Sequence, residues 1–407
     1  MSTEDPKGTV LILAWAFPPY ITGAARPFRF YKYLPRFGYT VQVLTASKQD
    51  PNDVQTNVTC VEGRIRGSKF ALEHVAERLQ KVIVAAESLM WALRTTAAAD
   101  QIISREKVCA VVSTSPPVAS HLVALKLKTR YGVRWIADFR DPLVGNPFRK
   151  DTGIAGHLDR LLQKWIFRRA DAVVATTDAT VELWRRQHPE HEKKMHLIWN
   201  GFDPEDRLEP VSLPQRAYKL LVHVGAIYGI RDPGALLCSF DRLIKRGLLS
   251  PEKLRIQLIG PVEGDWCRDR EPLADLVRLG CLRYDGVQVP KREAARAMAS
   301  ADAVILLDSH GEHGAIQVPA KLFDYIRIGR PILAVTTRNS PADRLLARSG
   351  VPYSSIYPED TPEEVDQRVL CFLSLPPHPV VASEWFWNEF DAYPQVRELA
   401  GLIAGSH

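Results

Sequence analysis

The sequence predicts an α/β protein made of two doubly wound domains, and three observations carry this prediction. Short apolar segments alternate with helical segments along the first 200 residues. The alternation begins again after a turn-rich stretch at residues 200–214. Such alternation favours a parallel sheet with helices on both faces. The chain has 407 residues, enough for about two domains.

In the first half, short apolar runs predict strands and the longer amphipathic segments between them predict helices. The expected strands are residues 10–16, 40–46, 108–113, 134–137, 172–175 and 195–199. The expected helices are residues 28–37, 118–131, 154–169 and 179–187.

The second half repeats this pattern. Strands are expected at residues 219–224, 255–259, 282–284, 303–307 and 331–335, and helices at 234–246, 269–279, 292–299, 318–328 and 342–348. The helix at 318–328 has the clearest ends, because Pro319 suits a first helical turn and Gly329 suits the left-handed residue after a helix.

These elements give the expected domain boundaries. Residues 1–203 form the first domain, residues 204–380 form the second, and residues 381–407 form a helical tail, broken near Pro394, that crosses back to the first domain. Ligands of doubly wound sheets bind at the carboxyl ends of the strands. Two such domains facing across a cleft suit a reaction between two separately held substrates.

Charge and composition narrow the function. Residues 1–200 carry 29 Lys and Arg against 19 Asp and Glu, whereas the rest carries 24 against 28. A basic first half suggests an anionic partner. No RNA-binding motif or zinc finger is visible, so nucleic acid is not expected. The six scattered cysteines fit a reducing compartment, and no apolar run approaches the length of a membrane span.

One long helical segment has a separate pattern. Apolar residues at positions 72, 75, 79, 82, 86, 89 and 93 form a heptad seam that is expected to pack on its own domain. Val84 and Trp91 would then lie exposed on the opposite side. Two interpretations stay open for them, which are ordinary surface exposure and docking on a membrane or second subunit.

The helix at 318–328 is the main candidate for ligand binding. Its N-terminus can bind an anion, and Lys321 and Asp324 could hold a phosphate and a diol. The alternative is a solvated surface ion pair between these two side chains. A Gly-x-Gly-x-x-Gly fingerprint and a Walker A loop are both absent, which argues against dinucleotide oxidoreductases and nucleoside triphosphatases.

Several motifs together resemble the glycosyltransferase family 4-like proteins. They are the turn from Phe17 to Gly23, the segment 113–117 (STSPP), the segment 137–142 (ADFRDP), the segment 198–203 (IWNGFD), the segment 223–225 (HVG) and the helix containing Lys321 and Asp324. The resemblance covers roughly residues 9–335 and implies the GT-B fold, in which two Rossmann-like domains face each other. It also implies that a nucleoside-diphosphate sugar binds mainly to the second domain and an acceptor to the first.

The resemblance also implies roles for residues on the donor side. Arg231 would contact the diphosphate, Asp324 the ribose, and Lys321 would help to stabilise the leaving group. The remaining expected donor-side residues are Gly23, Val287, Val289, Gly314, Ala315 and Ile316. For the loop at residues 286–289, an ordinary strand-to-helix turn is the alternative. Ile316 stands where many relatives have a glutamate that touches the donor sugar, and Glu312 or His310 could take that role. Glu312 is therefore included with Arg231 and Lys321 among the catalytic candidates.

On the acceptor side, Ser115, Asp138, Arg140 and Asp141 follow the ends of two predicted strands. They could face the acceptor, or Arg140 and its acidic neighbours could form a local ion pair. No metal ligands are assigned, because the two short His-containing segments lack a third ligand. No cofactor is expected besides the donor substrate.

The expected function is that of a retaining, metal-independent glycosyltransferase in the cytoplasm. Its acceptor would be a glycan, a lipid-linked sugar of surface-polysaccharide or glycoconjugate assembly, or a small molecule. Peripheral contact with the anionic inner membrane fits the basic first half. The alternatives are a sugar-nucleotide epimerase of the same fold and a non-catalytic protein that binds sugar nucleotides.

Overall fold

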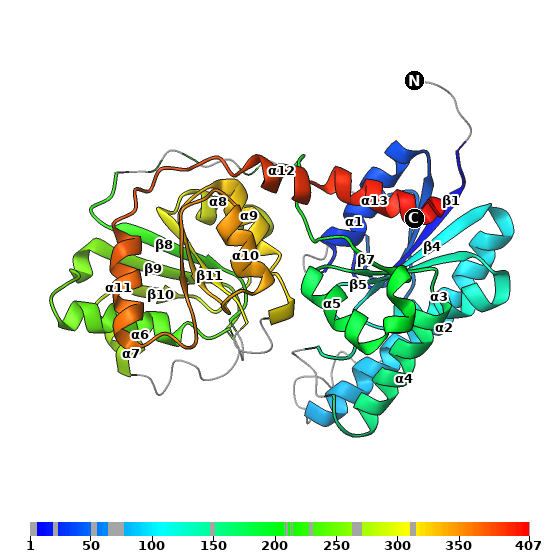
Figure 1. The fold of residues 1–407 in the computed structure, drawn as a ribbon, viewed down its shortest axis with the longest axis horizontal. Helices are drawn as coiled ribbons and strands as arrows, with labels where there is room; N and C mark the ends of the chain where they lie inside the picture. The colour runs from blue at the N-terminus through cyan, green and yellow to red at the C-terminus, as the bar shows by residue number, and fades with distance from the viewer. Residues whose placement is uncertain are drawn as a thin grey trace. The chain divides into compact units, whose positions relative to one another are not determined.

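The structure is a computed structural model that describes residues 6–18, 23–49, 55–63, 77–146, 151–206, 208, 211, 213, 215–227, 231–262, 271–309 and 315–406, without the side chains of 77–83 and 291. The chain divides into two compact units (Figure 1). Unit 1 comprises residues 1–200 and 392–407, and unit 2 comprises residues 201–391.

Unit 1 contains a seven-stranded sheet in the order β3-β2-β1-β4-β5-β6-β7, in which every pair of neighbours is parallel. Its strands are β1 (Thr9–Ala14), β2 (Thr40–Thr45), β3 (Val58–Cys60), β4 (Val108–Ser115), β5 (Arg134–Phe139), β6 (Ala172–Ala175) and β7 (Met195–Leu197). The central strands are buried on both faces, which explains their continuous apolar runs.

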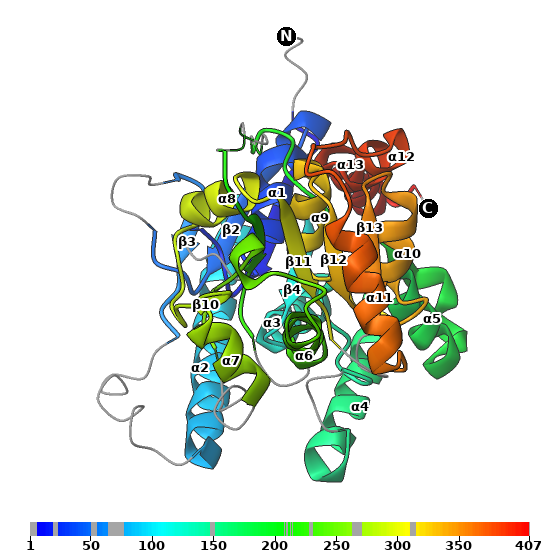
Figure 2. The same cartoon turned by 90° about the vertical axis from the view of Figure 1, so that its left-hand side faces the viewer.

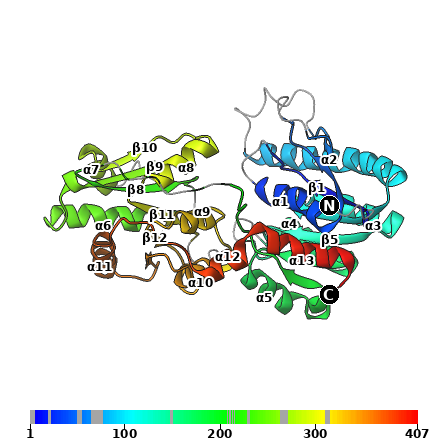
Figure 3. The same ribbon diagram turned by 90° about the horizontal axis from the view of Figure 1, so that it is seen from above.

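Helices cover both faces of this sheet. The helices α2 (Glu77–Arg105), α3 (Ala119–Tyr131), α4 (Gly153–Arg169) and α5 (Asp178–Gln187) supply the core of one face. The other core contains α1 (Ala25–Tyr33), the 3-10 helix η1 (Leu34–Phe37) and α13 (Ala392–Ala404). Figure 3 shows α13 beside the sheet of unit 1, far in sequence from the strands that it covers.

Unit 2 contains a six-stranded parallel sheet in the order β10-β9-β8-β11-β12-β13. Its strands are β8 (Lys219–Val224), β9 (Leu254–Ile259), β10 (Leu282–Tyr284), β11 (Ala303–Leu307), β12 (Ile332–Val335) and β13 (Tyr353–Ile356). The helices α6 (Gly234–Lys245), α7 (Glu271–Arg278) and α11 (Pro362–Leu373) form one core with this sheet.

The opposite face of that sheet carries α8 (Lys291–Ala299), α9 (Lys321–Ile328) and α10 (Pro341–Arg348) (Figure 2). The helix α9 ends where the sequence predicted, since Gly329 adopts a left-handed φ of 72°. A side chain at Gly329 would also collide with the backbone oxygen of Val380. The sequence did not predict β3, β13 or α11, of which the two strands are short edge strands.

The C-terminal segment is shared between the units. The helix α12 (Glu384–Phe390) lies in unit 2, where Phe386 and Phe390 are buried. The chain leaves helical geometry at Asp391 and α13 then packs on unit 1, so Pro394 lies inside the first turn of α13 and not at the break. Proline is tolerated there because the first helical N–H groups have no partner within the helix.

The predicted orientation of α2 was wrong. The seam residues Leu89 and Leu93 are 54% and 56% exposed, whereas Trp91 is fully buried and packs edge-on against Trp15 with ring centroids 5.4 Å apart. Val84 is exposed as expected. The larger side chain decides the buried face, because Trp91 buries more apolar area than either leucine. Within the described residues, no helix has the length and apolar character needed to cross a membrane.

Candidate active site

Both sheets reverse their strand order at one point, and the charged residues of interest gather at these points. The reversal lies between β1 and β4 in unit 1 and between β8 and β11 in unit 2. Ligands of doubly wound sheets bind outside the carboxyl ends of the strands at such a point. Each unit is therefore described from its own switch point.

In unit 2, Lys321 lies against the end of β8. The first residue after this strand is Gly225, whose φ is 139°, and a Cβ placed on it would lie 2.0 Å from the Nζ atom of Lys321. Glycine is thus required both by the backbone conformation and by the approach of the amine. Lys321 is the first residue of α9, so this helix directs its amine inward to the switch point.

His223 provides the nearest polar contact of that amine. Its Nδ1 atom lies 2.9 Å from the backbone oxygen of Ile305, which can only accept, so Nδ1 carries the hydrogen. Its Nε2 atom then accepts from Nζ of Lys321 at 3.4 Å. Complete burial, together with the charge of Lys321, places the pKa of His223 well below its usual range, so the ring is neutral.

Asp308 lies just beyond the end of the neighbouring strand β11 and is fully buried. Its carboxylate accepts from the backbone N–H of Ser309 at 2.7 Å and from the hydroxyl of Thr336 at 2.9 Å. Burial raises the pKa of Asp308 to about 6, although these two donors and the charges of Arg231 and Lys321 oppose the increase. Asp308 is therefore ionised at neutral pH.

These residues and Arg231 form what we call the strand-end cluster: His223, Arg231, Asp308 and Lys321. Burial lowers the pKa of Lys321 to about 7, the charge of Arg231 lowers it further, and the charge of Asp308 opposes both. The charges of Arg231, Lys321 and Asp308 thus influence one another at this end of the sheet. Because burial disfavours the charged form of Lys321, an anion bound beside it would favour that form.

Asp324 lies one turn further along α9 and faces a different neighbour. Its carboxylate is 3.6 Å from the guanidinium of Arg327, while Lys321 points away to His223. The alternative of a solvated Lys321–Asp324 ion pair is therefore wrong. The side chain of Asp324 is 37% exposed.

The other predicted donor-side residues lie on loops at the same edge of the sheet. Val287 is exposed and Val289 is half-buried on the loop after β10, two strands away from β8. Ala315 and Ile316 form a short, half-buried helical turn before α9. Glu312, His310 and Gly314 lie outside the described residues. The roles of these residues in donor binding stay predictions.

In unit 1, Arg140 ties together the loops at the switch point. Its guanidinium donates to the backbone oxygens of Gly23 at 2.6 Å, of Ser115 at 3.0 Å and of Pro116. A Cβ on Gly23, whose φ is 73°, would lie 1.9 Å from an Arg140 nitrogen. Gly23 thus admits the arginine, and the acidic neighbours Asp138 and Asp141 oppose the decrease that burial causes in the pKa of Arg140.

Asp138 forms a buried ion pair that sequence analysis missed. Its two oxygens accept from Nε of Arg26 at 3.0 Å each, and one accepts from a terminal nitrogen of Arg26 at 2.7 Å. The side chain of Asp138 is 1% exposed, and that of Arg26 is 3% exposed. Arg26 also donates to the backbone oxygen of Trp199 at 2.9 Å. This burial favours a structural role for Asp138 over contact with an acceptor.

Ser115 belongs to a buried chain of hydrogen bonds. His121 lies between two hydroxyls, with Nδ1 2.7 Å from Ser113 and Nε2 2.9 Å from Ser115. The indole of Trp135 donates to Ser113 at 2.7 Å. Burial lowers the pKa of His121 to about 3, so the imidazole stays neutral and fixes the position of Ser115 without adding charge.

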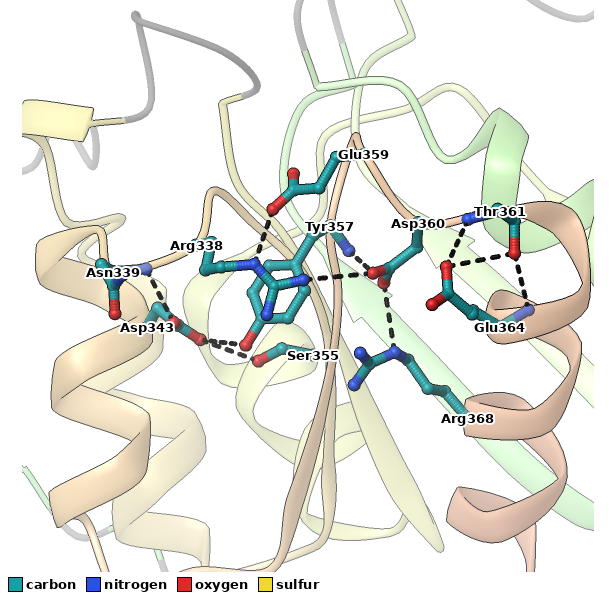
Figure 4. Close-up of polar contacts among 10 residues, drawn as sticks. All are labelled: Arg338, Asn339, Asp343, Ser355, Tyr357, Glu359, Asp360, Thr361, Glu364 and Arg368. Atoms are coloured by element: carbon teal, nitrogen blue, oxygen red, sulfur yellow. Dashed lines mark hydrogen bonds and ion pairs between the residues drawn. The ribbon is translucent and has the colours of Figure 1, made fainter.

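A second charged group at the carboxyl edge of unit 2 serves as a contrast (Figure 4). Asp343 accepts from the backbone of Asn339 and the hydroxyls of Ser355 and Tyr357 at 3.0 to 3.1 Å. The near-buried Asp360 is paired with Arg338 and Arg368. Figure 4 shows these contacts linking the ends of β12 and β13 to α10 and α11, which indicates a structural role.

The first unit of the chain is similar to a known protein family. Residues 23–201 match the glycosyl transferase 4-like domain family. The first unit is thus similar to the family 4-like glycosyltransferases, and the chain has the GT-B fold of the solved glycosyltransferase structures that it resembles. The matched residues cover the switch point of unit 1, including Gly23, Arg140 and the Arg26–Asp138 pair.

A curated relative and two solved structures extend this result. The D-inositol 3-phosphate glycosyltransferase of Nocardiopsis dassonvillei is 25% identical over 215 residues, which cover 50% of this chain and 49% of the relative. The chain thus spans about half the length of that relative. Sucrose-phosphate synthase from Thermosynechococcus elongatus has a TM-score of 0.65 at 14% identity, covering 98% of both chains. WaaG, a glycosyltransferase involved in lipopolysaccharide biosynthesis, has a TM-score of 0.63 at 14% identity, covering 97% of this chain and all of its own.

The sequence analysis singled out Arg231 and Lys321 but missed their buried neighbours His223 and Asp308. His223 was noted only as part of a motif, although a histidine inside an otherwise apolar strand could have marked it as a candidate site residue. The position of Asp308 was a clearer indication, because it directly follows the apolar strand Ala303–Leu307 and ligands of such sheets bind at the strand ends. No feature of the sequence predicted the ion pair of Arg26, since its partner Asp138 lies 112 residues away.

Proposed function

We propose that unit 2 binds a nucleoside-diphosphate sugar and that the enzyme transfers its sugar to a hydroxyl of an acceptor bound by unit 1. The observation that carries this proposal is the strand-end cluster, where the amine of Lys321 lies against the end of β8 at the switch point and the charges of Arg231 and Asp308 act on it. A diphosphate is the anion that a sugar nucleotide would bring to that point. It would compensate the buried positive charge and raise the pKa of Lys321.

The same two residues supply the expected chemistry. Negative charge develops on the diphosphate as the glycosidic bond breaks, and fixed cations in a buried site stabilise it. Asp324 is proposed to accept hydrogen bonds from the ribose hydroxyls, for which its partly exposed side chain is suited. The family resemblance supports retention of configuration and a reaction without a metal ion, and we propose both on that ground.

For the acceptor we propose an anionic molecule, because the first half of the chain carries 29 basic against 19 acidic residues. A phosphate-linked lipid glycan of surface-polysaccharide or glycoconjugate assembly fits this charge. A soluble sugar or cyclitol phosphate fits it too, as the name of the curated relative suggests. The scattered cysteines support a cytoplasmic reaction.

The direct test is to titrate the protein with UDP, GDP, ADP and dTDP. Calorimetry measures the affinity for each nucleotide, and thermal denaturation measures the melting temperature. One nucleotide should bind and raise the melting temperature, because a ligand of the folded state stabilises it. Arg231→Ala and Asp324→Asn should each weaken its binding about ten- to a hundredfold, as expected for charge-assisted hydrogen bonds. Arg231→Ala should also lower turnover, since its charge acts in the transition state.

A matched control is Glu182→Gln, which removes an exposed carboxylate paired with Arg186 on α5 of unit 1. It should leave nucleotide affinity unchanged. Equal affinities of the wild type and both site variants would overturn the donor site. Conversion of a sugar nucleotide without any acceptor would instead identify an epimerase, and binding without any conversion would identify a non-catalytic protein.

A further inference from the structure

The helix α4 of unit 1 presents an apolar stripe to solvent. Ile154, Leu158, Leu161 and Trp165 are 82%, 58%, 47% and 63% exposed. Their spacings of four, three and four residues place them within an arc of about 60° on the helix. Isolated apolar residues on a surface need no explanation, but a contiguous stripe marks an interaction surface.

The stripe is not the core-facing side of this helix. The opposite side carries Gly156, Gln163, Ile166 and Phe167, which are buried in unit 1. The helix thus has one apolar side that stabilises the fold and another that stabilises nothing in the described part of the chain. Its outward apolar residues extend over three turns.

Basic side chains border the stripe on both sides. At about 100° per residue, Lys164 and Arg168 lie on one border and Arg169 lies on the other. All three are exposed, and Asp159 is the one acidic residue within the helix. An apolar stripe with a tryptophan and a basic border is the pattern of a helix that lies in a membrane interface.

The position of α4 in the fold supports the interpretation that it lies in a membrane interface. The helix follows β5, so its first turns start at the carboxyl edge of the sheet, where Ser115 and Arg140 lie. The exposed Leu89 and Leu93 belong to α2, and both α2 and α4 extend beyond the sheet at the same end of unit 1 (Figures 1 and 2). Contact at this end would bring a lipid surface close to the proposed acceptor residues.

We propose that the α4 stripe docks unit 1 on an anionic membrane surface, with Ile154, Leu158, Leu161 and Trp165 inserted among the headgroups and Lys164, Arg168 and Arg169 facing anionic lipids. The charge of the border selects this occupant, because a second copy of the chain would bring the same positive border to the contact. The docking surface requires no nucleotide, so it can be tested apart from the proposed transferase reaction.

The test is co-sedimentation of the full chain with vesicles. One set contains phosphatidylcholine and phosphatidylglycerol in equal parts, and the other contains phosphatidylcholine alone. The protein should bind the first set at low salt and lose most of that binding at high salt, where the screening length falls to a few ångströms. Equal binding to both sets, or none to the anionic set, would overturn the proposal.

Two pairs of variants locate the surface. Ile154→Asp should reduce vesicle binding about tenfold or more, whereas Val381→Asp, at an 83% exposed position in unit 2, should not change it. Arg168→Glu should reduce binding at least about fivefold, because each basic charge near an anionic surface contributes about that factor. Lys253→Glu, at an exposed position in unit 2, makes the same change in net charge as Arg168→Glu and serves as its control.

Circular dichroism and thermal melting check that each variant is folded. All four substituted positions are exposed, so the variants should melt at the same temperature as the wild type. If Ile154→Asp and Val381→Asp bind vesicles equally, the stripe is not the docking surface. If Ile154→Asp instead abolishes a dimer measured by light scattering and the wild type ignores vesicles, a second copy covers the stripe and the membrane proposal is wrong.

Discussion

The two switch points hold similar residues but balance their charges differently. In unit 1, Arg26 and Asp138 are both almost completely buried and bind each other through three contacts of 2.7 to 3.0 Å. In unit 2, Lys321 contacts a neutral histidine, and the charges of Arg231 and Asp308 act on its pKa in opposite directions. A balanced buried pair orders the fold, whereas a lysine whose surroundings disfavour its charge is suited to a site that binds an anion.

The largest expected effect comes from breaking the balanced pair. Asp138→Ala leaves the Arg26 guanidinium buried without its counter-charge and should lower the free energy of unfolding by about 3–5 kcal/mol. Urea denaturation followed by tryptophan fluorescence measures this loss. The double variant Arg26→Met/Asp138→Leu removes both charges and should be less destabilised than Asp138→Ala. A loss below about 1 kcal/mol for Asp138→Ala would show that the pair does not order unit 1.

The next largest effect is expected from replacing Lys321, which should stabilise the fold but weaken nucleotide binding. Lys321→Met removes a buried cation and should weaken nucleoside-diphosphate binding about ten- to a hundredfold. It should also raise the free energy of unfolding by roughly 1–3 kcal/mol at pH 7, because the pKa of Lys321 is lower in the folded protein than in the unfolded chain.

The sign of the second effect follows from proton binding. Between pH 7 and the ordinary lysine pKa of 10.5, the unfolded chain binds the proton that folded Lys321 releases, so stability rises with pH in that window. Lys321→Met should therefore flatten the pH dependence of stability as well. If the variant is less stable than the wild type and still binds nucleotide, the amine is a packing residue and not an anion ligand.

A smaller effect is expected from pH alone. The affinity for a sugar nucleotide should fall by about tenfold from pH 6 to pH 8.5, because Lys321 with its pKa of about 7 loses the proton that favours the diphosphate. Ionisation of Asp308 above its pKa of about 6 acts in the same direction. Calorimetry with a sugar-linked nucleotide avoids titration of a terminal phosphate, whose own pKa is about 6. A pH-independent affinity would show that neither group contacts the anion.

The smallest effect concerns the charged residues of Figure 4. Arg338 is about half exposed and pairs with Glu359 at 2.7 Å. Arg338→Ala should lower the free energy of unfolding by about 0–1 kcal/mol, as is usual for exposed pairs, and should leave nucleotide affinity unchanged. Thermal melting and the same titrations measure both quantities. A large loss of nucleotide affinity would extend the donor site to this part of the edge.

The order of residues along the chain was enough to predict the fold class of both units and two members of the strand-end cluster. Strand and helix periodicity predicted the doubly wound pattern, and Gly329 marked the end of α9 because its backbone preference is local. Pro319 was expected in the first turn of this helix, but α9 begins at Lys321, so the proline lies just before it. The family resemblance added Arg231 and the expected role of Asp324. All of these signals depend on residues that lie close together along the chain.

Which charges are paired and which apolar faces are covered became visible in the folded chain alone. Arg26 and Asp138 are 112 residues apart, and Lys321 meets His223 across 98 residues, so no local pattern could reveal either contact. The outward direction of the Leu89–Leu93 seam and of the α4 stripe also depended on packing against the sheet. Periodicity shows that a helix has an apolar side, but the neighbouring elements decide whether that side is buried.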